Sequence, residues 1–183
     1  MTVNEIKPNT LCLEYRQEKG DEDYGSCLWA RFMFNLDRYE LTITSDCGNY
    51  GYKWCESTKE SFLELMARCD WGYMLDKLYG SADIFDYEAT KETFYKNCVY
   101  DDVDKEKMDL VFEDVEEYGT PESAEAFLMD FERADYDSYF DHGDIWEMVE
   151  YDYPANALKI VHVFEDCIRP KIREILEREG EEK

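Results

Sequence analysis

Four aspartates between residues 135 and 144 carry carboxylates that could bind a hard divalent cation. Oxygen ligands at the short spacing that calcium and magnesium accept come from Asp135, Asp137, Asp141 and Asp144. However, Tyr139 occupies the third ligand position of a calcium loop, and Phe140 stands where such a loop needs glycine. We therefore predict no metal in this segment, and we keep a carboxylate-metal-dependent enzyme as an alternative.

The two histidines, His142 and His162, do not form part of a recognisable catalytic motif. His162 lies among apolar residues and is interpreted as a packing or surface residue, whereas His142 sits among carboxylates. Neither has a neighbouring serine or cysteine in a known nucleophile motif. The stretch GNYGYK lacks the glycine spacing of a phosphate-binding loop. We therefore expect no catalytic residues, no cofactor and no enzymatic activity.

The cysteines give no metal or disulfide pattern. They are seven, an odd number, and are scattered without any C-x-x-C pair. Cys47 and Cys55 flank a predicted strand at a spacing that zinc sites do not use. We interpret the cysteines as reduced, cytosolic side chains that pack as small hydrophobic groups. The N-terminal residues MTVNEIKPNT show no signal-peptide pattern, and no apolar run is long enough to cross a bilayer.

The negative charge is concentrated in one segment. The chain has a net charge of −25, and residues 101–152 alone hold 20 acids and 3 bases. Such a chain cannot bind nucleic acid by neutralising phosphates, because that mechanism needs lysine and arginine. The same charge disfavours an anionic membrane surface. It favours a protein that repels its own copies or one that binds a basic partner.

We predict that this segment presents a partner-binding surface of carboxylates and tyrosines. Its members are Glu113, Asp114, Glu116, Glu117, Asp135, Tyr136, Asp137, Tyr139, Asp141, Asp144, Glu147, Glu150 and Asp152. Balancing bases are nearly absent, so like charges raise the free energy of the folded chain. Tyrosine is enriched at protein interfaces. Such a surface could imitate a phosphate backbone or block a positive channel, whereas a simple solvated face is the alternative.

The elements that must position these residues fall into two parts. Residues 10–54 alternate between apolar and polar side chains, which predicts an antiparallel meander of about four strands with one wet side. Within it, Tyr50, Tyr52 and Trp54 follow a glycine turn and point to one face, where we expect helices to pack. The fold class is therefore α+β, with an N-terminal sheet packed against C-terminal helices.

Residues 57–179 show helical spacing throughout. Ser57 and Glu60 stand at capping-box spacing, and Gly80 and Gly119 are placed to end helices. Thr120 and Pro121 predict another helix start. A long final helix is predicted from Pro154, with a kink at Pro170. We expect one domain over 1–183, with a sheet portion at 10–56, a helical portion at 57–179 and a frayed tail at 180–183.

Two stretches resemble a group of small phage and prophage proteins. The first is SDCGNYGYKW, from Ser45 to Trp54, together with the helical segment from Glu60 to Leu78. The pattern in that group is serine-aspartate-x-glycine-x-aromatic-x-tyrosine-x-tryptophan. The second runs from Tyr151 to Glu174 and begins with YDYP. Together the two stretches cover about a third of the chain.

Within that group, the chain is similar to type II-A anti-CRISPR proteins, which inhibit an RNA-guided DNA nuclease. The resemblance implies that the chain binds the type II effector nuclease with its guide RNA and interferes with DNA recognition or cleavage. That nuclease holds nucleic acid in positively charged channels, which the acidic segment suits. We expect no direct nucleic-acid binding, no membrane association, and a place in the cytoplasm of an infected or lysogenic bacterial host. An acidic phage accessory protein without a specific partner remains a further alternative.

Overall fold

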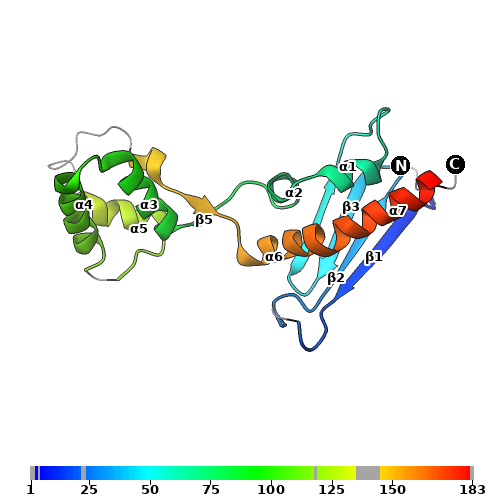
Figure 1. The fold of residues 1–183 in the computed structure, drawn as a ribbon, viewed down its shortest axis with the longest axis horizontal. Coiled ribbons are helices and arrows are strands. Elements are labelled where there is room, and N and C mark those ends of the chain that lie inside the picture. Colours follow the sequence, from blue (N-terminus) through cyan, green and yellow to red (C-terminus); the bar gives the residue numbers. More distant parts are fainter. Residues whose placement is uncertain (1–2, 4, 22–23, 118, 135–144, 182–183) are drawn as a thin grey trace. The chain divides into compact units, whose positions relative to one another are not determined.

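The chain folds into two compact units, which Figure 1 shows in a computed structural model. Unit 1 comprises Met1–Ser81 with Ala155–Lys183, and unit 2 comprises Ala82–Pro154. The structure describes residues 3, 5–21, 24–117, 119–134 and 145–181. The α+β class is confirmed, because an N-terminal sheet precedes the helices. The expectation of a single domain over 1–183 stays a prediction.

Unit 1 is built on the predicted four-stranded antiparallel meander. Neighbouring strands along the chain are neighbours in the sheet, and their order is β1 (Thr10–Arg16), β2 (Trp29–Asn35), β3 (Glu40–Ser45) and β4 (Gly48–Lys53). Register pairs Phe32 with Ile43, and Ile43 with Tyr50. The alternation of apolar and polar side chains sets this register, since a slip of one residue would turn the apolar set to solvent.

One face of the sheet is covered by helices. The side chains buried on it are Ala30, Phe32, Phe34, Leu41 and Ile43. The C-terminal helices α6 (Ala155–Val163) and α7 (Arg169–Glu181) run along the sheet in Figure 1. Between them, Phe164 packs with its ring 6.1 Å from that of Phe32. Leu28, which directly precedes β2, is 43% exposed.

The helix after the sheet begins later than the sequence predicts. Helix α1 (Phe62–Arg68) has its capping box at Ser61 and Glu64, so the prediction of Ser57 and Glu60 was wrong. Both carbonyl oxygens of the predicted cap residues contact the Tyr39 hydroxyl, which keeps that segment out of a helix. Helix α2 (Trp71–Leu78) follows and ends just before Gly80, as predicted.

The irregularity predicted at Pro170 takes the form of a wide turn. Residues Phe164–Ile168 form the π-helix η3 directly before it, and the Arg169 N–H bonds to the Phe164 carbonyl. Proline has no N–H for an α-helical bond, and a π-turn accommodates this loss within a continuous helix.

Unit 2 is helical around an aromatic core. Its helices are α3 (Tyr87–Cys98), α4 (Asp102–Val115), α5 (Ala124–Arg133) and the 3₁₀ helix η2 (Ile145–Met148). The rings of Phe94 and Phe127 lie 4.6 Å and 5.0 Å from that of Phe131. Helix α5 is capped by Ser123, two residues beyond the predicted start at Pro121.

Two short strands join the entry and exit of unit 2. Strand β5 (Ile84–Phe85) pairs antiparallel with β6 (Tyr151–Asp152). The Asp86 N–H continues this ladder to the Glu150 carbonyl at 3.0 Å. Unit 2 is therefore an insertion between α2 and α6 whose two ends are held together by its own backbone.

Candidate functional site

Helix α4 presents a continuous acidic stripe to solvent. Its buried face consists of Met108, Val111, Phe112 and Val115, at the spacing of one helix side. Beside this face lie the exposed carboxylates that we call the acidic stripe: Asp102, Glu106, Asp109 and Glu113 on the helix, and Glu116 at its C-cap. Successive members are three or four residues apart, so they follow one another at about 5 Å along the helix axis.

The stripe belongs to a unit with few cations. Unit 2 contains 24 acidic and 5 basic side chains, a net charge of −19, whereas unit 1 carries −6. Lys107 lies 3.8 Å from Asp104, and Arg133 pairs with Asp130 on α5. Such exposed pairs contribute little to stability. The unit thus folds with most of its negative charge uncompensated.

Two tyrosines of α3 fix carboxylates of the stripe from the protein side. The Tyr87 hydroxyl donates to Glu116 at 2.6 Å, and Lys91 bonds the same oxygen at 2.6 Å. The Tyr95 hydroxyl donates to Asp109 at 2.5 Å. These contacts hold the two carboxylates in defined orientations, where an unsupported side chain would sample several rotamers.

The electrostatics of these pairs follow from burial and hydrogen bonding. The hydrogen bonds from Lys91 and then Tyr87 lower the pKa of Glu116, so it stays ionised at neutral pH. Burial, followed by the neighbouring carboxylate, raises the pKa of both Tyr87 and Tyr95, which remain neutral donors.

The predicted surface residues outside the stripe have different environments. Asp114, Glu117, Glu147 and Asp152 are exposed. Glu150 is half-buried and serves the fold, because Thr93 donates to its carboxylate at 3.0 Å. The predicted residues Asp135, Tyr136, Asp137, Tyr139, Asp141 and Asp144 lie outside the described residues, as does His142.

Three stripe members were missed by sequence reasoning. Asp102, Glu106 and Asp109 extend the predicted pair Glu113 and Glu116 towards the start of α4. The signal was present, since acids recur at alternating steps of four and three residues from 102 to 116. Exposed apolar side chains lie on the same helix, where Val103 is 57% and Leu110 52% exposed.

The aromatic residues in β4 and directly after it are mainly structural. Trp54 is buried and packs 5.5 Å from the ring of Phe62, and its Nε1 donates to the Tyr73 hydroxyl at 3.0 Å. Tyr52 remains 38% exposed. Gly48 adopts a φ of 120°, and a Cβ there would lie 3.0 Å from the Tyr50 hydroxyl oxygen. The glycine is therefore required by the turn.

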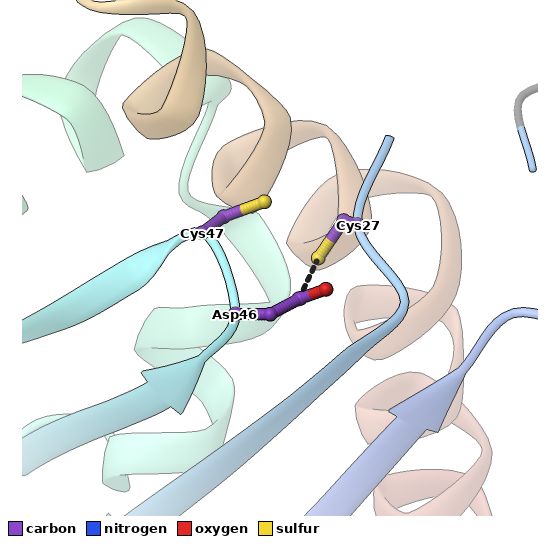
Figure 2. Close-up of side chains that lie close together, drawn as sticks. All are labelled: Cys27, Asp46 and Cys47. Atoms are coloured by element: carbon purple, nitrogen blue, oxygen red, sulfur yellow. Dashed lines mark hydrogen bonds between the residues drawn. The ribbon is translucent and has the colours of Figure 1, made fainter. Parts of the chain in front are cut away.

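A second cluster in unit 1 joins two thiols and a carboxylate. The ligand atoms of Cys27, Asp46 and Cys47 all lie within 4.8 Å of one another. Figure 2 shows the three side chains converging between the β3–β4 turn and the segment that enters β2, with a hydrogen bond of 3.7 Å from the Cys27 Sγ to Asp46. Asp46 is fixed there by the N–H groups of Leu28 at 2.9 Å and Trp29 at 3.3 Å.

The Cys27 thiol is a poor nucleophile at neutral pH. Burial, followed by the neighbouring Cys47, raises the pKa of the Cys27 thiol to about 12, so it is protonated at neutral pH. Desolvation raises the pKa of Asp46, but the backbone donors Leu28 and Trp29 outweigh it and the pKa is lowered. Cys27 also lines a cavity of about 480 Å³, together with His162, Asp166 and Cys167.

A protein-family model matches residues 3–174 and is described as a phage family, Phage_phiTE_072. The chain belongs to this phage family. The match extends across both units of the phage protein, so the acidic insertion lies within the matched region. The phage character expected from the resemblance is thereby confirmed, whereas the anti-CRISPR assignment and the SDxG signature stay predictions.

The other comparisons add no relative. No curated protein matches this phage-family chain. No solved structure matches it either. Within the described ranges, none of the helices combines the length and apolar character that spanning a bilayer requires.

Proposed function

We propose that this phage protein is an inhibitor that binds a basic nucleic-acid-binding groove of a host enzyme. The observation that carries the proposal is the acidic stripe on α4, set in a unit of net charge −19. Self-repulsion of this size costs folding free energy, and a cationic partner would offset that cost. The protein acts by occupying the groove and performs no chemistry of its own.

The stripe forms a regular row of negative charges, which is wider spaced along its axis than the phosphates of a DNA strand. Its carboxylates follow one another at about 5 Å along the helix axis, and phosphates of one DNA strand at about 3.4 Å along the duplex axis. Tyr87 and Tyr95 hold two of these carboxylates in place. A preorganised array loses less rotamer entropy on binding than free side chains do.

The proposed target is a type II CRISPR effector nuclease loaded with guide RNA. The resemblance of Ser45–Trp54 and Tyr151–Glu174 to anti-CRISPR proteins supports this choice. Such effectors hold nucleic acid in basic channels and read a short duplex motif through arginines. We propose that the protein acts in the bacterial cytoplasm and interferes with DNA recognition or cleavage. It binds neither nucleic acid nor membranes directly.

A pull-down with purified type II effector, with and without guide RNA, tests the proposal. We expect capture of the effector, loss of its target-DNA binding or cleavage, and weaker association as salt rises. The informative variant is Glu106→Lys, Glu113→Lys and Glu117→Lys together, which reverses two charges of the acidic stripe and one exposed charge just beyond α4. We expect this variant to bind at least tenfold more weakly, mainly through slower association.

A matched variant controls for net charge. Glu177→Lys, Glu179→Lys and Glu181→Lys change the total charge by the same amount on the exposed side of α7 in unit 1. We expect it to bind almost as the unchanged protein does. Equal weakening of effector binding by both variants would mean that binding depends only on the total charge of the protein. Failure to capture any type II effector would reject the proposed target.

A further inference from the structure

We infer that Cys27, Cys47 and Asp46 form a Zn²⁺-binding site in unit 1. The two sulfurs and the carboxylate come from chain positions 19 and 20 residues apart, and pairing of β2 with β3 brings them together. This site goes beyond the proposed inhibition, which rests on unit 2, and can be tested without any partner.

The donor set suits zinc better than the other common divalent ions. Thiolates select zinc and copper(I), whereas calcium and magnesium require oxygen ligands. A carboxylate is an accepted third ligand of zinc, alongside sulfur and nitrogen. Two thiols beside one carboxylate therefore point to zinc even in a chain rich in acids.

The distances require only a small adjustment. Ligand atoms of a tetrahedral zinc site are about 3.5–3.8 Å apart, given Zn–S bonds of about 2.3 Å and Zn–O bonds of about 2.1 Å. The Cys27 Sγ already lies 3.7 Å from the Asp46 Oδ1, and all three donor atoms lie within 4.8 Å of one another. A contraction of about 1 Å, within the range of rotamer motion, completes the triangle.

Backbone groups orient the ligands from behind. Asp46 accepts N–H bonds from Leu28 and Trp29, which fix its carboxylate but leave lone pairs on its oxygens. The Cys47 N–H bonds to the Ser45 hydroxyl at 3.1 Å, so the turn that carries both residues is also held. Such supporting contacts set ligand geometry in metal sites.

One of the three proposed ligands borders a cavity. Cys27 lines the cavity of about 480 Å³, and the imidazole of His162 lines it too. An imidazole or a water molecule can serve as the fourth zinc ligand. Binding replaces two S–H bonds with Zn–S bonds and releases the two protons to solvent.

Cobalt(II) titration of the full-length, reduced, metal-free protein tests the site. We expect a thiolate-to-cobalt charge-transfer band that saturates at one ion per chain and disappears when Zn²⁺ is added. Carboxylates elsewhere on the protein give no such band. The variants Cys27→Ser and Cys47→Ser should lose it, whereas the exposed Cys12→Ser and Cys55→Ser are matched controls that should keep it.

A measurement on the unmodified sequence guards against variants that fail to fold. X-ray absorption of the zinc-loaded protein should give two Zn–S bonds and the remaining bonds to nitrogen or oxygen. A shell without sulfur, the absence of any charge-transfer band, or a band that survives both Cys27→Ser and Cys47→Ser would overturn the inference.

Discussion

The Tyr87 hydroxyl donates a hydrogen bond of 2.6 Å to Glu116, linking the aromatic core of unit 2 to its acidic surface. Tyr87 is buried among aromatic rings, 6.3 Å from that of Phe112, whereas Glu116 is exposed at the C-cap of α4. The core thus positions a surface charge directly. A surface built this way depends on the packing of the aromatic core beneath it.

Replacing Tyr87 with phenylalanine should destabilise unit 2 at neutral pH and destabilise it less in alkali. The lost bond to a charged acceptor costs about 1–2 kcal/mol. The folded pKa of Tyr87 is raised, so its contribution is complete below the unfolded value of about 10 and is lost at higher pH. Tyr87→Phe should therefore lose less stability above pH ~10. Hydrogen exchange of α3 and α4 against pH measures both effects, with Tyr24→Phe as control.

Neutralising two members of the acidic stripe should stabilise the protein. Glu106 and Glu113 each have like-charged neighbours at both three and four residues' distance on α4. Each such pair costs about 0.2–0.5 kcal/mol, so Glu106→Gln with Glu113→Gln should raise the free energy of unfolding by about 1–2 kcal/mol. Urea denaturation at low and high salt measures this gain, which should shrink as salt screens the repulsion.

The control for that experiment is Glu56→Gln, an exposed change in unit 1. It should leave unit 2 unchanged at either salt concentration. A loss of stability in the double variant would mean that the stripe has attractive partners. The same variant should bind a basic partner less well, because the charges that strain the fold are those proposed to bind.

Removing the Asp46 carboxylate should weaken unit 1. Its bonds to the N–H groups of Leu28 and Trp29 tie the β3–β4 turn to the start of β2. Asp46→Ala should lower the free energy of unfolding by about 2 kcal/mol, and Asp46→Asn by less, since an amide oxygen still accepts. Tryptophan fluorescence during denaturation follows the change. Asp76→Ala removes only a surface pair with Lys77 and should cost under about 0.5 kcal/mol.

A cavity in the core of unit 2 should affect that unit first. Phe127 is fully buried, and Phe127→Ala should cost about 3–5 kcal/mol. Hydrogen exchange should accelerate in α3, α4 and α5, while strands β2 and β3 keep their protection. Equal acceleration in the sheet would show that the two units unfold as one, as the single-domain expectation requires.

The β-meander could be predicted because its signal is local. Alternation over five or six residues specifies both the strand and its buried face, as at Phe32 and Phe34. Helix α1 was placed too early because Ser57–Glu60 and Ser61–Glu64 both fit the capping-box spacing. The choice between them involves Tyr39, in the turn before β3, whose hydroxyl contacts the carbonyl oxygens of Ser57 and Glu60.

The candidate sites, too, could be predicted only where their signal is local in the sequence. The excess of acids at 101–152 and the helical spacing on α4 are both visible in the sequence. The hydrogen bonds from Tyr87 and Tyr95 could not be predicted, since they join different helices. Cys27 and Cys47 are 20 residues apart, and neither belongs to a C-x-x-C pair that would mark a metal site. Their convergence depends on strand pairing.

The pairing of β5 with β6 makes unit 2 an insertion whose two ends lie side by side. Ile84 and Asp152 are backbone partners, so this strand pair, and not the helices of unit 2, fixes where the chain enters and leaves the unit. A phage lineage could exchange those helices for another sequence with adjoining ends while the sheet of unit 1 stays as it is. The architecture thus places the acidic helices on a part of the chain whose two ends stay side by side whatever sequence lies between them.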